Sequence, residues 1–442
     1  MRLKLLDRPL CYSLRQFRHP PLPLDPPRPI SQVFTSRKLA AVLFLGFSSG
    51  LPYNLTFDTL QAWMTGAGIT LTTIGLFSLA RLPYSLKFLW SPVVDRLTPP
   101  IFGRRRGWIA LMQLAIALVL TVMATVDPQG QLQILAVLAV LLALLSATQD
   151  IAFDAYRTDI LDAEELGAGA ALGVLGYRFA LVVTSALAFR LAEWRSWPEV
   201  YLWMAALMAG GVLITLWSPE PRNLQPPPSL AEAVRLPLVE FFGRSGMGRG
   251  LAILAFIVLY KLGDTLALTM TVPFLKTLFS EGTIGDIRGG VGFVATTLGV
   301  LAGGLLLGRI GINRSLWVFG ALQAASNLGY FLLALAGKSP LLFAAVVTVE
   351  NGCAGLGTAA FVAFLMSLCD ARYSATQYAL LSSLMAVGGI VLGSTTGLVA
   401  GATGWPLFFV LTATAAVPGL LLLPLFAPWK ERTPATAIKS TF

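Results

Sequence analysis

Charged residues, histidine and cysteine are scarce in this sequence. Only 12% of its 442 residues are charged, whereas about 25% is usual in a soluble globular domain. The single histidine, His19, and the cysteines, Cys11, Cys353 and Cys369, are widely spaced and share no ligand motif. A disulfide framework or a metal site is therefore not expected. No nucleophile–base constellation is present either, so we expect no enzyme activity.

Long apolar runs make up much of the chain, in which 56% of the residues are hydrophobic. A helix needs about 20 apolar residues to cross the hydrocarbon of a bilayer, and short polar connections separate many runs of that length. The sequence therefore predicts an all-α polytopic membrane protein with twelve transmembrane helices. The predicted spans are 38–66, 71–95, 107–126, 131–158, 167–191, 198–218, 250–277, 284–308, 315–336, 339–366, 374–400 and 405–427.

Two polar tails and a central linker divide these spans into two halves. The first 37 residues are basic and rich in proline, and they lack the apolar core and cleavage site of a signal peptide. We interpret them as a disordered cytoplasmic tail. The predicted units are the tail 1–37, a six-helix half 38–218, a cytoplasmic linker 219–249, a six-helix half 250–427 and a cytoplasmic tail 428–442.

The linker differs in composition from the spans on either side. The run Pro226-Pro227-Pro228 cannot continue a helix. Ser229 followed by Glu232 then forms a capping box, and a mixture of apolar and basic residues follows. This pattern predicts a short helix that lies at the membrane surface.

The net charge of +10 is concentrated in connections on one side of the predicted membrane. Because basic connections stay in the cytoplasm, the positive-inside rule places both termini there. We interpret the charge as topology information and expect no nucleic-acid partner. Two six-helix halves joined by a cytoplasmic linker resemble the major facilitator fold.

Charged residues inside the predicted spans are candidates for function, because a charge costs at least about 2.5–3.5 kcal/mol at the centre of a membrane helix. Asp150, Asp154 and Arg157 are spaced four and then three residues apart, so they share one helix face. This acid–acid–base stripe could bind a proton or a polar substrate. Alternatively, Asp154 could simply hold Arg157 in place at a cytoplasmic gate. We expect Asp159 and Asp162 to lie in a solvated loop.

The second half contains two further polar groups of this kind. Lys261 and Asp264 are three residues apart and can pair, either as a coupling site or as a neutralised structural pair. Glu350-Asn351 lies in an apolar, glycine-rich span and parallels Gln149-Asp150 in the first half. Glu350 is the strongest candidate for a proton carrier, unless it only forms a hydrogen bond with Asn327 or Gln323.

Three other polar residues allow more than one interpretation. Arg178, next to Tyr177, could grip a carboxylate or phosphate with two hydrogen bonds, or it could extend to the cytoplasmic surface. Ser374 and Gln377 match a capping box that opens the eleventh span. Asp58 is an acid in the first span with no obvious local partner.

Motifs throughout the predicted membrane region resemble one family, the AmpG-type muropeptide permeases of the major facilitator superfamily. Those of the first half are Gly46-Phe47-Ser48-Ser49-Gly50-Leu51-Pro52, Thr59-Leu60-Gln61-Ala62-Trp63-Met64, Lys87-Phe88-Leu89-Trp90-Ser91-Pro92, Asp95-Arg96, Gly103-Arg104-Arg105-Arg106-Gly107-Trp108, Gln149-Asp150-Ile151, Phe153-Asp154-Ala155, Gly167-Ala168-Gly169-Ala170 and Leu175-Gly176-Tyr177-Arg178. Those of the second half are Leu259-Tyr260-Lys261-Leu262-Gly263-Asp264, Glu350-Asn351 and Ser374-Ala375-Thr376-Gln377. Asp58 is not part of this pattern.

The resemblance implies a proton-driven permease of the bacterial cytoplasmic (inner) membrane, with the proton motive force in place of a cofactor. It would import N-acetylglucosaminyl-1,6-anhydromuramyl peptides from the periplasm for cell-wall recycling, which in some bacteria leads to β-lactamase induction. The implied partners are this small-molecule substrate and the lipid bilayer. A monomer is the usual state of the fold.

The stretch from Asp95-Arg96 to Arg104-Arg105-Arg106 resembles a diverged form of the superfamily's cytoplasmic gate motif. In that motif, an acid at a helix end and the basic residues after it form salt bridges across the two halves in the outward-open state. A plain positive-inside anchor is the alternative interpretation.

The residues and the resemblance together predict three groups of functional side chains. Proton coupling is predicted for Asp150, Glu350, Asp264 and Asp154. Substrate binding is predicted for Gln61, Gln149, Tyr177, Arg178, Lys261, Asn351 and Asn327. The predicted gate consists of Asp95, Arg96, Arg104, Arg105 and Arg157.

Two other functions stay open at this point. The first is a carrier of another large anionic solute, similar to the acetyl-CoA carriers, which a more cationic cavity would favour. The second is a membrane assembly factor that transports nothing, similar to the pigment-delivery proteins. That factor would purify with pigment or with partner proteins.

Overall fold

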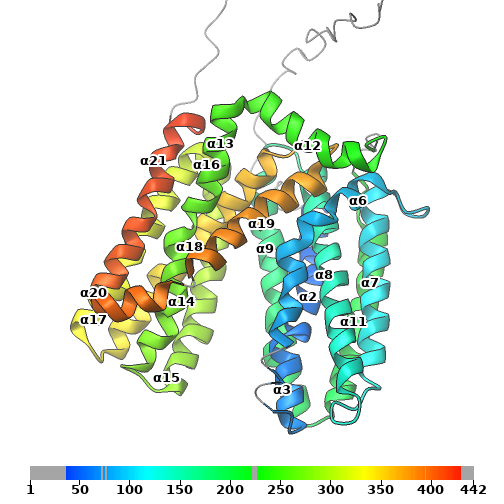
Figure 1. Cartoon of the computed structure of the whole chain (residues 1–442), viewed down its shortest axis with the longest axis horizontal. Helices are drawn as coiled ribbons and strands as arrows, with labels where there is room; N and C mark the ends of the chain where they lie inside the picture. Colours follow the sequence, from blue (N-terminus) through cyan, green and yellow to red (C-terminus); the bar gives the residue numbers. More distant parts are fainter. Residues whose placement is uncertain (1–35, 71–72, 75–76, 222–225, 394, 430–442) are drawn as a thin grey trace, which may run out of the picture.

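The computed structural model describes residues 36–70, 73–74, 77–221, 226–393 and 395–429. Within these ranges the chain forms helices and no strands, and two helical bundles stand side by side (Figure 1). The predicted tails 1–37 and 428–442 fall almost entirely outside the described residues, as do Cys11 and His19.

The first bundle corresponds to the predicted half 38–218. Its helices are α2 (Arg37–Thr56), α3 (Asp58–Gly66), η1 (Phe77–Arg81), α5 (Leu82–Leu86), η2 (Lys87–Leu89), α6 (Ser91–Arg96), α7 (Arg104–Met123), α8 (Leu132–Ile160), α9 (Leu166–Val182), η3 (Val183–Leu187), α10 (Ala188–Ala192) and α11 (Trp197–Trp217). The predicted span 71–95 is therefore not one regular helix. Pro83 and Pro92 lie within it, and proline lacks the N–H that an unbroken α-helix requires.

A helix in the linker begins where the capping box predicts it. In α12 (Leu230–Ser245), the Glu232 N–H donates to the Ser229 side chain at 3.2 Å. Leu230, Val234 and Leu238 remain exposed on this helix, which runs along one end of the molecule and connects the two bundles (Figure 1).

The second bundle contains two chain reversals at glycine. Its helices are α13 (Met247–Tyr260), α14 (Leu262–Lys276), α15 (Glu281–Gly285), η4 (Asp286–Gly292), α16 (Phe293–Ser326), α17 (Leu328–Ala336), α18 (Pro340–Ser367), α19 (Ser374–Gly393), α20 (Thr396–Ala415) and α21 (Val417–Phe426). Gly311 interrupts α16 with φ 79°, and Gly404 interrupts α20 with φ 73°. Side chains rarely adopt this left-handed conformation, so glycine allows the turns that separate neighbouring predicted spans.

Nine helical stretches among the described residues are long and apolar enough to cross a membrane. One of them, Gly282–Ala336, has 55 residues and includes two predicted spans on either side of Gly311. The chain is thus a multi-pass membrane protein, while the count of twelve spans stays a prediction.

Glycine allows neighbouring helices within each bundle to touch backbone to backbone. A Cβ atom added at Gly176 of α9 would lie 2.0 Å from the Leu43 carbonyl oxygen of α2. A Cβ atom at Gly299 of α16 would lie 2.2 Å from the Gly352 carbonyl oxygen of α18. Since both neighbours are backbone atoms, neither helix–helix contact can adjust by moving a side chain alone. We therefore expect each bundle to move as a rigid unit.

We expect Gly176→Ala to destabilise the first bundle by about 1–3 kcal/mol, because the added methyl group must displace the backbone of α2. Thermal unfolding of the purified protein in detergent measures this change. Gly308→Ala is the matched control, since a Cβ atom there has nothing within 4 Å. Equal unfolding temperatures for the two variants would contradict the prediction.

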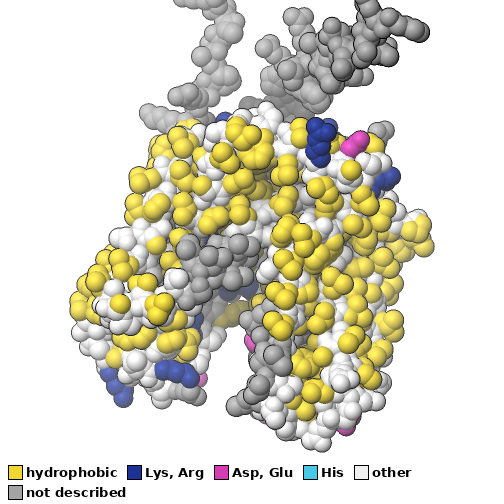
Figure 2. Space-filling view, viewed as in Figure 1, with side chains coloured by type: hydrophobic (Ala, Val, Ile, Leu, Met, Phe, Trp, Pro, Cys, Tyr) yellow, Lys and Arg dark blue, Asp and Glu magenta, His cyan; other side chains and the backbone are white. Residues whose placement is uncertain are grey.

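The two bundles touch at the linker end and separate at the opposite end (Figures 1 and 2). At the linker end, a Cβ atom at Gly304 of α16 would lie 2.6 Å from the Ala171 Cβ of α9. The first and last described residues also lie at this end: Arg37 donates to the Trp217 carbonyl at the end of α11, and Arg314 donates to the Trp429 carbonyl. The space between the bundles therefore opens away from the linker.

Candidate functional site

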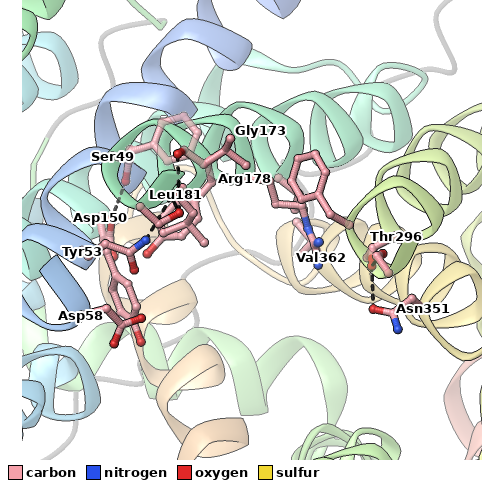
Figure 3. A pocket seen from close by; sticks show the side chains of 18 of the residues that line it. Ser49, Tyr53, Asp58, Asp150, Gly173, Arg178, Leu181, Thr296, Asn351 and Val362 are labelled. Atoms are coloured by element: carbon pink, nitrogen blue, oxygen red, sulfur yellow. Dashed lines mark hydrogen bonds between the residues drawn. The ribbon is translucent and has the colours of Figure 1, made fainter. Parts of the chain in front are cut away.

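A cavity of about 1160 Å³ lies between the two bundles. A second cavity of about 800 Å³ adjoins it along the other bundle, and both are lined by Arg178, Thr296 and Asn351. Figure 3 shows Ser49, Tyr53, Asp58 and Asp150 on one side and Thr296 and Asn351 on the other. The two cavities form one space, with polar groups on both walls, that a ligand can enter from the end opposite the linker.

The acid–acid–base stripe of α8 lies on the wall of this cavity. Asp154 forms ion pairs with Lys87 at 3.2 Å and with Arg157 at 2.7 Å. Asp150 accepts a hydrogen bond from the Ser49 hydroxyl of α2 (Figure 3), and no described cation lies within ion-pair distance of it. The two acids therefore differ: Asp154 is neutralised by two cations, whereas Asp150 has only a hydroxyl donor.

Arg157 also connects the two bundles. Its guanidinium group donates to the Tyr378 hydroxyl of α19 and lies 5.0 Å from the centre of that ring. Both side chains are buried, at the linker end of the cavity. This contact closes the floor of the cavity, and the gate role of Arg157 stays a prediction.

The wall of the second bundle carries a comparable set of groups. Lys261 and Asp264 form an ion pair at 3.2 Å, and Asn327 donates to Asp264 at 3.4 Å. Glu350 is 3% exposed and accepts from the Asn351 side chain at 2.8 Å. Among the described residues, no cation forms an ion pair with Glu350. Each cavity wall thus has an acid in an ion pair, Asp154 or Asp264, and an acid for which the described residues show no ion pair, Asp150 or Glu350.

Two arginines on the cavity wall form no ion pair with the described residues. Arg178 of α9 and Arg288 of η4 line the cavity from opposite bundles, and in the described part of the chain neither forms an ion pair or a side-chain hydrogen bond. The Nη1 atom of Arg288 is buried without a hydrogen-bond partner. Since charged groups in a membrane protein usually pair or face water, both are available to an anionic ligand.

Asp95 is the centre of the contact that closes the linker end. Its carboxylate is fully buried. It accepts from the Ala375 N–H at 3.3 Å, the Thr376 N–H at 2.8 Å and the Thr376 hydroxyl at 2.7 Å. It also pairs with Arg105 at 3.0 Å. An acid of the first bundle therefore caps the N-terminus of α19 in the second bundle, where free N–H groups and the helix dipole favour a negative charge.

The arginines that follow take different positions. Arg105 is 1% exposed and bridges Asp95, Asp159 at 2.7 Å and the Ser374 hydroxyl at 2.7 Å. Arg104 donates to the Ala371 carbonyl of the second bundle at 3.1 Å. Arg96 has no hydrogen bond or ion pair among the described residues. The structure thus brings Arg104 and Arg105, but not Arg96, into contact with the second bundle.

Two expectations about this end were wrong. Asp159 is not in a solvated loop: it lies at the end of α8, and its side chain is only 5% exposed because Arg105 of α7 packs against it. Ser374 does not act as a capping residue, since its hydroxyl accepts from Arg105 and Asp95 caps the helix instead. Gln377 accepts from the Asp370 N–H at 2.6 Å and donates to Glu240 of α12 at 2.8 Å. The linker helix is thereby attached to the gate.

Some predicted binding residues lie away from the cavity wall. Gln149 is fully buried in the first bundle and donates to Ser48 at 3.2 Å. Asn327 is buried behind Asp264, and Gln61 is not among the lining residues. Tyr177, Arg178, Lys261 and Asn351 do line the cavity. The binding and coupling roles of all these residues stay predictions.

The sequence interpretation missed several residues that the structure brings to the site. They are Ser49, Thr296 and Arg288 on the cavity wall, Tyr378 in its floor, and Glu220, which accepts from the backbone and side chain of Arg106. The signal for Arg288 was present, since it is an arginine in a run that also contains Gly289 and Gly290.

The chain is similar to several known proteins. The sequence profile described as Major Facilitator Superfamily matches residues 42–393. An anhydromuropeptide permease of Escherichia coli (strain K12) is 48% identical over 396 residues, which cover 89% of this chain and 80% of that protein. A putative transporter AmpG 4 of Rickettsia felis is 33% identical, with 89% of this chain and 97% of that protein covered.

Among solved structures, the major facilitator superfamily transporter FucP in the outward conformation has a TM-score of 0.66 with this chain. The two sequences are 15% identical, and the match covers 89% of this chain and 98% of that one. At this identity the likeness concerns the fold alone. The fold includes two bundles that meet at the linker end.

Proposed function

Because this chain belongs to the major facilitator superfamily and, within it, to the AmpG-type anhydromuropeptide permeases, we propose that it imports anhydromuropeptides by proton symport. The cargo is N-acetylglucosaminyl-1,6-anhydromuramyl peptide, which is carried from the periplasm to the cytoplasm for cell-wall recycling. The protein works in the bacterial cytoplasmic membrane. Since both cavity walls and the gate come from one chain, it works as a monomer.

The cavity carries this proposal. It is open at the end opposite the linker, closed at the linker end by Asp95, Arg105 and Arg157, and large enough at about 1160 Å³ for a ligand of several rings or residues. Its wall presents hydroxyl, amide and aromatic groups for sugars, with Arg178 and Arg288 for carboxylates. With the linker in the cytoplasm, this form receives cargo from the periplasm.

Two acids without a cationic partner support coupling to protons. Asp150 and Glu350 lie one in each bundle, whereas Asp154 and Asp264 are held in ion pairs. A lone carboxylate in the membrane is costly when charged, and binding a proton removes the cost. Protonation therefore favours the closed, cargo-loaded state, and release of the proton into the cytoplasm resets the carrier.

Uptake of radiolabelled anhydromuropeptide into right-side-out membrane vesicles tests the proposal. We expect accumulation above the external concentration, which a protonophore abolishes, and no accumulation in vesicles without the protein. Inverted vesicles serve as the orientation control. If the folded protein in these vesicles takes up no labelled cargo, the muropeptide assignment is wrong; accumulation that survives the protonophore contradicts proton coupling.

No feature of the cavity favours the alternatives. A carrier of acetyl-CoA-like solutes would need a strongly cationic wall, whereas the cavity wall carries Asp58, Asp150 and Asp154 beside its arginines. An assembly factor that transports nothing has no use for a gate at one end of a polar cavity. We therefore propose that the protein is a transporter without enzyme activity.

A further inference from the structure

We propose that Arg288 is a specificity-determining residue that binds a second carboxylate of the cargo, on the wall opposite Arg178. The permease then prefers anhydromuropeptides whose peptide carries two or more free carboxylates over the peptide-free disaccharide, which has a single lactyl carboxylate. This inference rests on the proposed function and adds the chemical feature by which cargo is ranked.

Some of the charges on the cavity wall are matched by ion pairs within the protein. Asp154 is matched by Lys87 and Arg157, and Asp264 is matched by Lys261. In the described part of the chain, neither Arg178 nor Arg288 forms an ion pair, and Asp150 and Glu350 on the same walls form none either. Both guanidinium groups can therefore bind a carboxylate of a ligand without first breaking an ion pair.

The surroundings of Arg288 leave room for that ligand. It lies on η4, a π-helical segment, next to Gly289 and Gly290, where an added Cβ atom would have nothing within 4 Å. Its Nη1 atom is buried and makes no hydrogen bond. π-Helical segments and unsatisfied buried donors are both concentrated at functional sites. An arginine that only reached for the membrane surface would not line the cavity with Thr296 and Asn351.

The two arginines belong to different bundles, so a ligand that binds both must span the cavity. A cargo with one carboxylate can satisfy Arg178 or Arg288 but not both. A cargo with two carboxylates can satisfy both and gains a second charge-assisted, bidentate contact. Because hydrogen bonds to charged groups contribute about 1.5–3 kcal/mol, the second contact predicts at least about a ten-fold preference.

Uptake kinetics for two purified cargoes test the inference: the anhydrodisaccharide with a tripeptide and the same disaccharide without peptide. In wild-type vesicles we expect kcat/KM to favour the tripeptide cargo at least about ten-fold. In Arg288→Gln we expect KM for the tripeptide cargo to rise by that factor with kcat unchanged. The peptide-free cargo should be unaffected, and Arg288→Lys should restore part of the preference.

Arg309→Gln is the matched control, because Arg309 is exposed and its side chain forms no hydrogen bond or ion pair with the described residues. Size-exclusion profiles in detergent confirm that each variant is folded. A preference that is unchanged in Arg288→Gln, or an equal loss for both cargoes, overturns the inference while leaving the permease intact. Failure of the wild type to transport either cargo overturns the proposed function and this inference together.

Discussion

We expect Glu350→Gln to lose uphill, gradient-driven uptake by about 100-fold or more while it retains exchange of cargo across the membrane. The glutamine can keep a hydrogen bond to Asn351, which now joins Glu350 at 2.8 Å, but it can neither bind nor release a proton. Since Glu350 is 3% exposed and has no cationic partner among the described residues, its charged form is costly in the membrane. The carrier would then cycle without consuming the proton gradient.

Two assays separate these activities: accumulation in energised vesicles, and counterflow of labelled cargo against unlabelled cargo with no gradient. Glu164→Gln is the matched control, because Glu164 is exposed and loses the same charge outside the cavity. Full accumulation in Glu350→Gln would exclude this acid as the proton carrier. If Asp150→Asn then lost accumulation instead, the coupling site would lie in the first bundle.

We expect Asp95→Asn to shift the carrier toward the form that is open at the linker end, and to lower uptake at least about ten-fold without changing the ratio between cargoes. The asparagine oxygen can still accept one hydrogen bond. The asparagine NH2 group, however, would face the N–H groups of Ala375 and Thr376, and two donors cannot form a hydrogen bond with each other. The substitution also removes the negative charge next to Arg105. A loss of about 1.5–3 kcal/mol corresponds to a shift of about 10- to 150-fold in the equilibrium.

Distances between spin labels in a cysteine-free background measure this shift. Glu164 and Arg309 are suitable label positions, since both are exposed at the linker end and each bundle carries one. Asp370→Asn is the matched control, because Asp370 pairs with the exposed Arg372 of the same loop at 2.9 Å and such surface pairs contribute little. Unchanged distances and normal kinetics in Asp95→Asn would exclude a gating role.

The fold could be predicted from sequence because a bilayer imposes a simple rule. Apolar runs of about 20 residues predicted the spans, and the profile match, the FucP likeness and the all-helical structure confirm the major facilitator fold. An exception was 71–95, whose described residues form several short helices around Pro83 and Pro92 instead of one long helix. The helix in the linker was predicted correctly because its capping box is a local signal.

The candidate site was only partly predictable, because some of its residues lie close together in the sequence and others lie far apart. Asp150, Asp154 and Arg157 share a helix face, and local spacing was enough to group them. The partners of Asp95 in the second bundle lie about 280 residues away in the chain, and no spacing rule connects positions that far apart. Asp159 was misjudged for the same reason, because its burial depends on Arg105 from another helix.

The closed linker end has a consequence for hydration. Asp95, Arg105, Ser374 and Thr376 are at most 2% exposed where the bundles meet, so their polar groups are shielded from water in this form. When the bundles separate there, each of these groups must bind water in place of its lost partner. Opening toward the linker side is therefore also a hydration reaction at this interface, and the cost of wetting or leaving these buried groups unpaired contributes to the barrier between the two forms.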